Sequence, residues 1–153
     1  MRNKRLVGKI DSSFIVVSDN MPIIEVYDDK SLDLIHQFDY SYIPQIKSLI
    51  IFEKTNPIER EDSYRCISED MCITNNHLYI SIYTRNKSVH DSYLNLIIKF
   101  EIKPEIKPVS VLKLPGRWFT TFCVDENDGI IYAYNNPDNS IGAYLIPKTP
   151  KNE

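Results

Sequence analysis

The segment Leu78-Tyr79-Ile80-Ser81-Ile82-Tyr83 carries apolar side chains on both faces of an extended chain. Because side chains alternate along a strand, the leucine and the two isoleucines fall on one face and the two tyrosines fall on the other. A sheet with one face in water would instead place a polar residue at every second position. The segment therefore predicts a strand within a sheet that is packed between two others.

Similar short runs, rich in Ile, Val, Tyr, Phe and Leu and closed by Asp, Asn, Pro or Gly, recur along the whole chain. Such runs are typical of strands separated by turns. We predict strands at residues 14–17, 23–27, 32–38, 47–52, 64–67, 78–83, 94–100, 109–114, 118–124, 130–134 and 141–146, with a further candidate at 6–10. No window sustains a helical period with a credible cap, so we expect no helices.

Three units of the sequence share one order of strands and turns. They span residues 13–38, 71–114 and 122–146, and each has a short strand, an acidic or Asn-rich turn, a Tyr-containing strand, a polar turn and a further strand. The last two units lie about fifty residues apart, which is the spacing of four-stranded propeller blades. We assign the longer offset of the first unit to an inserted polar loop at residues 53–63.

The third unit resembles the closing blade of six-bladed, TolB-like β-propeller proteins. The resemblance rests on Val124-Asp125 before a turn that ends in Gly129, on Ile131-Tyr132 in the next strand, and on Ile141-Gly142-Ala143-Tyr144 in the last. The first unit, with Ile24-Glu25-Val26-Tyr27-Asp28, is similar to an earlier blade of this family. The resemblance implies an all-β propeller fold that binds a protein or a small polar ligand through its loops.

The number of predicted strands makes about three blades, whereas a closed propeller has at least four. Three arrangements would resolve this. Two chains could complete one ring as a homodimer, the chain could be the C-terminal part of a longer propeller protein, or the strands could pack as a β-sandwich. We expect residues 1–153 to form a single propeller-like domain or the C-terminal part of one.

The composition is that of an ordinary globular protein, with 153 residues, 42% of them hydrophobic and 25% charged. The net charge of −3 gives no basic surface for nucleic acid, and no apolar run is long enough to span a membrane. Lys9 and Asp11 interrupt the apolar stretch that would make the N-terminus a signal peptide. We therefore expect a cytoplasmic protein as the sequence is written, and a periplasmic or cell-surface one if a signal precedes it.

Motifs of known chemistry are missing from the sequence. Cys66, Cys72 and Cys123 lack metal or redox spacing and are expected to be reduced, buried thiols. His36, His77 and His90 show no paired ligand spacing, and no nucleophile elbow or glycine-rich phosphate loop occurs. The acidic turn at 125–129 is interpreted as a β-hairpin rather than a calcium loop. We predict no catalytic residue, no metal site and no cofactor.

The candidate contact residues are aromatic and basic. Tyr83, Arg85, Arg117 and Trp118 lie at or beside predicted turns, and Trp, Tyr and Arg are enriched at binding hot spots. For Trp118 we favour packing between blades over a contact role, because tryptophan is usually largely buried. The first hypothesis is a non-enzymatic binding module; the alternatives are a propeller hydrolase or lyase with a carboxylate metal site in its central channel, and a fragment of a longer propeller.

Overall fold

The computed structural model describes residues 4–56, 66–85 and 92–147, which contain eleven strands and one helix. The strands form three antiparallel sheets in which neighbours along the chain are also neighbours in the sheet. Blade 1 contains β1 (Arg5–Ile10), β2 (Ser13–Ser18), β3 (Ile23–Asp28) and β4 (Leu34–Asp39); blade 2 contains β5 (Ser68–Ile73), β6 (His77–Arg85), β7 (Ser92–Glu101) and β8 (Lys107–Lys113); blade 3 contains β9 (Phe119–Asp125), β10 (Ile130–Asn135) and β11 (Ser140–Leu145). The predicted all-β, propeller-like fold of about three blades is confirmed.

Blade 2 lies in the middle and is buried on both faces, as the alternation in residues 78–83 predicts. Leu78, Ile80 and Ile82 on one face of β6 belong to a large apolar core shared with blade 1. Tyr79 on the other face belongs to a smaller core shared with Ile131 and other residues of blade 3. Burial on both sides explains why the inner strands β6 and β7 carry apolar residues on both faces.

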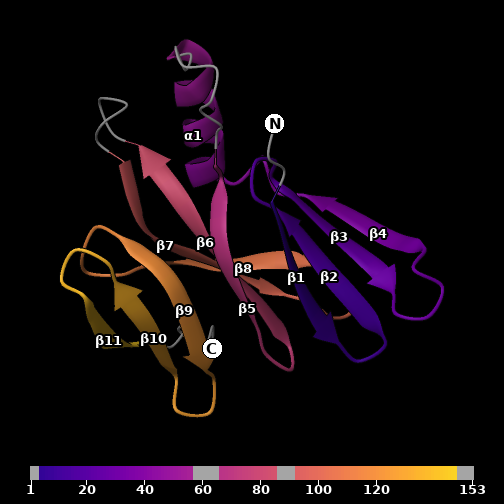
Figure 1. Ribbon diagram of the computed structural model, residues 1–153. Coiled ribbons are helices and arrows are strands. Elements are labelled where there is room, and N and C mark those ends of the chain that lie inside the picture. Colours follow the sequence, from indigo (N-terminus) through magenta and orange to yellow (C-terminus); the bar gives the residue numbers. More distant parts are fainter. Residues whose placement is uncertain (1–3, 57–65, 86–91, 148–153) are drawn as a thin grey trace, which may run out of the picture.

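The first strands of the three blades line up beside one another. β1 contacts β5, and β5 contacts β9. Figure 1 shows the blades fanning outward from these strands in chain order, with blade 1 and blade 3 at the two ends. Within the described ranges β9 does not contact β1, so the blades form an open arc rather than a closed ring.

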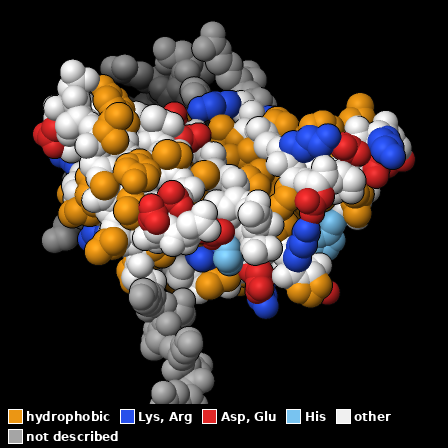
Figure 2. Space-filling model, turned by 90° about the horizontal axis from the view of Figure 1, so that it is seen from below, with side chains coloured by type: hydrophobic (Ala, Val, Ile, Leu, Met, Phe, Trp, Pro, Cys, Tyr) orange, Lys and Arg blue, Asp and Glu red, His pale blue; other side chains and the backbone are white. Residues whose placement is uncertain are grey.

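The outer blades each leave one face uncovered, and the free face of blade 3 is strongly apolar. Tyr132, Ile141 and Leu145 on this blade are 39%, 75% and 81% exposed. In Figure 2, which views the molecule from below, hydrophobic side chains gather over blade 3 on the left, whereas charged side chains lie mainly over the middle and the right. Val7 and Leu34 of blade 1 are exposed apolar residues at the other end of the arc.

The helix α1 (Pro44–Thr55) contradicts two predictions, the strand at 47–52 and the absence of helices. Its buried residues, Ile46, Leu49 and Glu53, are spaced by three and four positions and so share one helical face. Pro44 in the first turn is a helix-start signal, because the missing N–H has no helical partner there. The run at 49–52 suggested a strand because a short apolar run alone does not distinguish strand from buried helix.

Blade 1 starts one strand earlier than the repeat in the sequence suggested. β1, the tentative strand at 6–10, corresponds to β5 and β9, whereas the repeat had matched β2 to β5. The predicted inserted loop at 53–63 is wrong at residues 53–55, which belong to α1, and its residues 57–63 lie outside the described ranges. The predicted strand at 64–67 is also wrong where it can be compared, since residues 66 and 67 precede β5 and residues 64 and 65 lie outside the described ranges.

The acidic turn between β9 and β10 is the hairpin that the sequence predicted. The Asp125 carboxylate accepts hydrogen bonds from the backbone N–H groups of Asn127 at 3.0 Å and Asp128 at 3.2 Å. Gly129 has a φ of 66°, a conformation that side chains disfavour. The turn also places Glu126 at the boundary between blades 2 and 3.

The described part of the chain contains no helix long and apolar enough to cross a bilayer.

Candidate functional site

Two of the predicted contact residues, Tyr83 and Trp118, meet at the boundary between blades 2 and 3. Their rings pack edge to face with centroids 5.8 Å apart. The Tyr83 hydroxyl also donates a hydrogen bond to Glu69 Oε2 at 2.6 Å. Both aromatic side chains are half-buried, so Trp118 takes part in packing at the boundary.

The two predicted arginines lie in different surroundings. The Arg117 guanidinium lies 5.0 Å from the ring centroid of Tyr93, and its Nε donates to the Ser92 carbonyl at 3.3 Å. Arg85 instead forms a 2.7 Å ion pair with Glu53 of α1, and these two side chains are 15% and 8% exposed. The structure therefore brings Tyr83 and Trp118 into contact and pairs Arg85 with α1, and ligand binding by the set stays a prediction.

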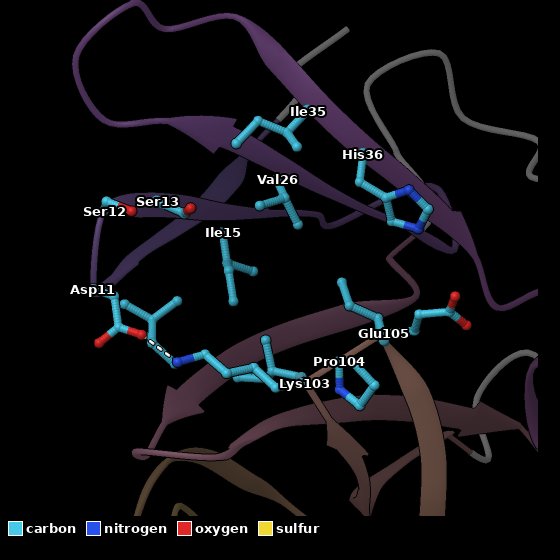
Figure 3. Close-up of a pocket in the computed structure, with 13 residues that line it drawn as sticks. Asp11, Ser12, Ser13, Ile15, Val26, Ile35, His36, Lys103, Pro104 and Glu105 are labelled. Atoms are coloured by element: carbon cyan, nitrogen blue, oxygen red, sulfur yellow. Dashed lines mark hydrogen bonds and ion pairs between the residues drawn. The ribbon is translucent and has the colours of Figure 1, made fainter.

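A pocket of about 470 Å³ lies between blade 1 and the turn that joins β7 to β8. Its apolar lining consists of Ile10, Ile15, Val26, Ile35, Ile102, Pro104 and Ile106. Figure 3 shows Ile15 and Val26 extending from blade 1 into the space above Lys103 and Pro104, which form the opposite wall. The volume is within the range of pockets that bind small molecules or single side chains.

Polar groups surround the opening of this pocket. Asp11, in the turn between β1 and β2, forms an ion pair with Lys103 of the facing turn, as the dashed line in Figure 3 marks. The rim also contains Ser12, Ser13, His36 and Glu105. An apolar interior with a few polar groups at its edge is the usual composition of a ligand pocket.

Sequence reasoning did not find this pocket because its walls are distant in the chain. Asp11 and Lys103 are separated by 92 positions, and neither belongs to a recognisable motif. The apolar lining residues of blade 1 were visible only as strand residues, a pattern that also describes the core, and Ile102, Pro104 and Ile106 fall between two predicted strands. Only the pairing of blade 1 with blade 2 brings the two walls together.

A second polar cluster joins blades 2 and 3 around Glu126. Its Oε1 accepts a hydrogen bond from the Tyr79 hydroxyl at 2.6 Å and lies 2.5 Å from His77 Nδ1 and 3.6 Å from Lys99 Nζ. The start of β6, the end of β7 and the β9–β10 turn supply these groups. A cavity of about 760 Å³ opens beside them.

The partners of Glu126 keep its carboxylate ionised. Burial acts to raise the pKa of Glu126, but hydrogen bonds from Tyr79 and Thr74 and the charges of His77 and Lys99 outweigh it, so the pKa falls below its ordinary value. Burial, followed by the hydrogen bond to this carboxylate, raises the pKa of the Tyr79 hydroxyl. A carboxylate with so many partners is a link between blades rather than a proton donor poised near neutral pH.

Within the described ranges, the cysteines and histidines do not join a metal-binding group. Cys66, Cys72 and Cys123 are free, and burial raises the pKa of the Cys72 thiol. Cys123 is exposed, so the prediction of a buried thiol is wrong at that position. Over residues 4–56, 66–85 and 92–147, no three His, Cys, Asp or Glu side chains lie together as a metal-binding group. His90 lies outside these ranges.

No protein-family model and no curated protein matches this chain. Among solved structures, the chain is similar to the crystal structure of the WD40 repeats of RRP9, with 12% sequence identity and a TM-score of 0.49. The matched region covers 95% of this chain and 42% of that one. The chain therefore spans less than half the length of the RRP9 structure.

Proposed function

We propose that the chain is a non-enzymatic, propeller-type interaction module that binds an apolar side chain of a partner protein between blades 1 and 2. The observation that carries this proposal is the pocket of about 470 Å³, with its apolar lining and polar rim. The predicted contact residues support it less, because Tyr83 and Arg85 already have partners within the chain.

The pocket favours a partner that presents one apolar side chain and hydrogen-bonding backbone groups beside it. Its depth is set by Ile15 and Ile106, which are 0% and 6% exposed, so a branched aliphatic or aromatic side chain would be desolvated there. Ser12 and Ser13 at the rim could form hydrogen bonds with the partner's backbone. Partner recognition would then combine one apolar anchor with a few polar contacts.

Methyl NMR with isoleucine-labelled protein tests this proposal. The titrants are N-acetyl-leucinamide and N-acetyl-tryptophanamide, which mimic single side chains. We expect saturable shifts at the methyl groups of Ile15, Ile102 and Ile106, and none at Ile131 in the core between blades 2 and 3. Saturable shifts confined to other residues, or no saturable shift at all, would remove the pocket as the binding site.

A pair of surface variants sharpens the test. Ile35 on the pocket wall is 58% exposed, so Ile35→Glu should weaken binding without unfolding the chain. Ile51 on α1 is 53% exposed and does not line the pocket, so Ile51→Glu is the matched control. Equal binding by both variants would contradict the proposal.

We also propose that two copies close one six-bladed ring, as the TolB-like resemblance implies. The uncovered apolar side chains at the two ends of the arc, among them Val7 and Tyr132, support this assembly. Light scattering after size exclusion should then give twice the chain mass of 17.9 kDa. Tyr132→Lys should return the protein to one chain mass. A wild-type monomer would contradict the ring and leave the pocket proposal standing.

A further inference from the structure

β11, the outer strand of blade 3, lacks the protection that β8, the outer strand of blade 2, carries. Its six residues, Ser140–Leu145, include no charged residue and no proline. β8, the outer strand of blade 2, carries Lys107, Pro108 and Lys113. Lysine and proline discourage the addition of another strand to an open edge. The free edge of blade 3 is therefore suited to pairing, whereas that of blade 2 is guarded.

The backbone of β11 presents unpaired hydrogen-bonding groups on its outer side. The Ile146 N–H donates to the Gly129 carbonyl at 2.8 Å, on the side of β10. Because N–H and C=O groups alternate in direction along a strand, those of Ile141, Ala143 and Leu145 point to the free side. Among the described residues, no backbone group pairs with these three on that side.

A cavity of about 390 Å³ lies beside this edge. Leu112 and Leu114 of the blade 2 side and Ile131 and Tyr144 of blade 3 are among its lining residues. Blades 1 and 2 both have a fourth strand next to their third, at the place that is open in blade 3. A strand added to β11 would direct alternate side chains toward blade 2 and into this cavity.

We propose that β11 accepts an extended segment of a partner protein, which pairs antiparallel to it and completes blade 3 as a fourth strand. The segment would place a branched aliphatic side chain in the cavity and an acidic residue beside Lys113, which also lines it. This surface is separate from the pocket between blades 1 and 2. The inference therefore goes beyond the proposed function and does not depend on it.

A second copy of this chain fits the open edge less well. If two β11 strands pair about a two-fold axis in the register that places Ala143 at the axis, with their inner faces on the same side, Gly142 of the second copy faces Tyr144. A glycine has no side chain to enter the cavity that Tyr144 lines. The cavity thus favours a segment with a branched apolar residue at this position.

The experiment uses the full chain and a phage-displayed library of peptides of about seven residues, close to the length of an ordinary strand, with apolar residues at alternate positions. The best peptide is then labelled with fluorescein and its affinity is measured by anisotropy. Ala143→Pro should weaken binding by about tenfold, because it removes a donor on the free edge without breaking the pairing with β10. Ile35→Glu, which alters the pocket, should leave this affinity unchanged.

Two further measurements keep the proposal open to refutation. If Ala143→Pro fails to fold, Leu145→Lys at an 81% exposed position places a charge on the same edge and should give the same loss. A peptide with N-methyl groups on the residues that face β11 should not bind, since it lacks the hydrogen-bond donors. The proposal is overturned if no peptide is enriched, if the N-methylated peptide binds equally, or if the edge variants only convert a self-associated wild type to monomers.

Discussion

The two boundaries of blade 2 are built from different kinds of contact. Toward blade 1, the core is aliphatic and aromatic, with Phe100 packed edge to face on Phe38 and Tyr40 at centroid distances of 6.1 and 5.5 Å. Toward blade 3, the apolar core is smaller and polar side chains cross between the sheets. The same strands of blade 2 supply both surfaces through alternate residues.

Two carboxylates carry most of the polar contact between blades 2 and 3. Asp70 of β5 accepts hydrogen bonds from the Thr121 hydroxyl at 2.7 Å and the Phe122 N–H at 3.1 Å. Glu126 reaches back from blade 3 to Tyr79 and His77 of blade 2. Apolar burial does not depend on charge, whereas these contacts do. The comparison therefore predicts that the two boundaries respond differently to mutation and to pH.

The largest effects should come from two neighbouring isoleucines of β7. Ile98 faces blade 1 and Ile97 faces blade 3, and they are 0% and 1% exposed. Each change to alanine should lower the free energy of unfolding by about 2–5 kcal/mol, with Ile98→Ala the larger because its core is the more extensive. Urea unfolding measures both. A larger loss for Ile97→Ala would mean that the core toward blade 3 contributes more to the free energy of unfolding than the core toward blade 1.

The sequence predicted β6, β7 and β10 well because apolar residues occupy both faces of each of these strands, although only blade 2 is buried on both faces. It failed at α1, where Leu49-Ile50-Ile51-Phe52 satisfies a strand pattern, while Pro44 at the helix start and tertiary packing favour the helix. The hairpin before Gly129 was predicted because its turn chemistry is local.

The candidate sites were much harder to predict from the sequence. The pocket joins Asp11 to Lys103 across two blades, and the partners of Glu126 come from the ends of two distant strands. No local spacing encodes either arrangement. The aromatic pair of Tyr83 and Trp118 was selected by residue type, and its mutual packing follows only from the approach of β9 to blade 2.

The second prediction concerns the polar boundary. Glu126→Gln keeps the size of the side chain but removes the charge that faces His77 and Lys99, and it should lower the free energy of unfolding by about 1–2 kcal/mol. Glu105→Gln is the matched control, since Glu105 is an exposed carboxylate in the turn between β7 and β8. Its urea midpoint should stay at the wild-type value. Equal midpoints for both variants would show that Glu126 does not stabilise the boundary.

The third prediction is a pH dependence that only one boundary should show. The pKa of Glu126 in the folded chain lies below its ordinary value of 4.5, so its ionised form stabilises the fold at neutral pH. The difference in unfolding free energy between wild type and Glu126→Gln should be complete above pH 4.5. It should shrink as the pH falls through the lower, folded-state pKa, where the carboxylate becomes protonated in both states.

The difference between wild type and Ile98→Ala provides the control for this titration, because Ile98 carries no charge and should give the same value at each pH. Urea unfolding from neutral pH down to the acidic limit of the folded state measures both series. A constant difference for Glu126→Gln would mean that its effect comes from packing rather than from ionisation.

The smallest effect should come from the ion pair that bridges blades 1 and 2 at the pocket rim. Lys103 and Asp11 have side chains that are 58% and 66% exposed, so solvent and salt screen their attraction. Lys103→Gln should change the free energy of unfolding by less than about 0.5 kcal/mol in urea titrations. A loss as large as that of Glu126→Gln would mean that charged contacts stabilise both boundaries to the same extent. The proposed difference between the two boundaries would then be wrong. A small loss would instead make Lys103→Gln a clean probe of partner binding, because any change in affinity would then arise at the rim and not from unfolding.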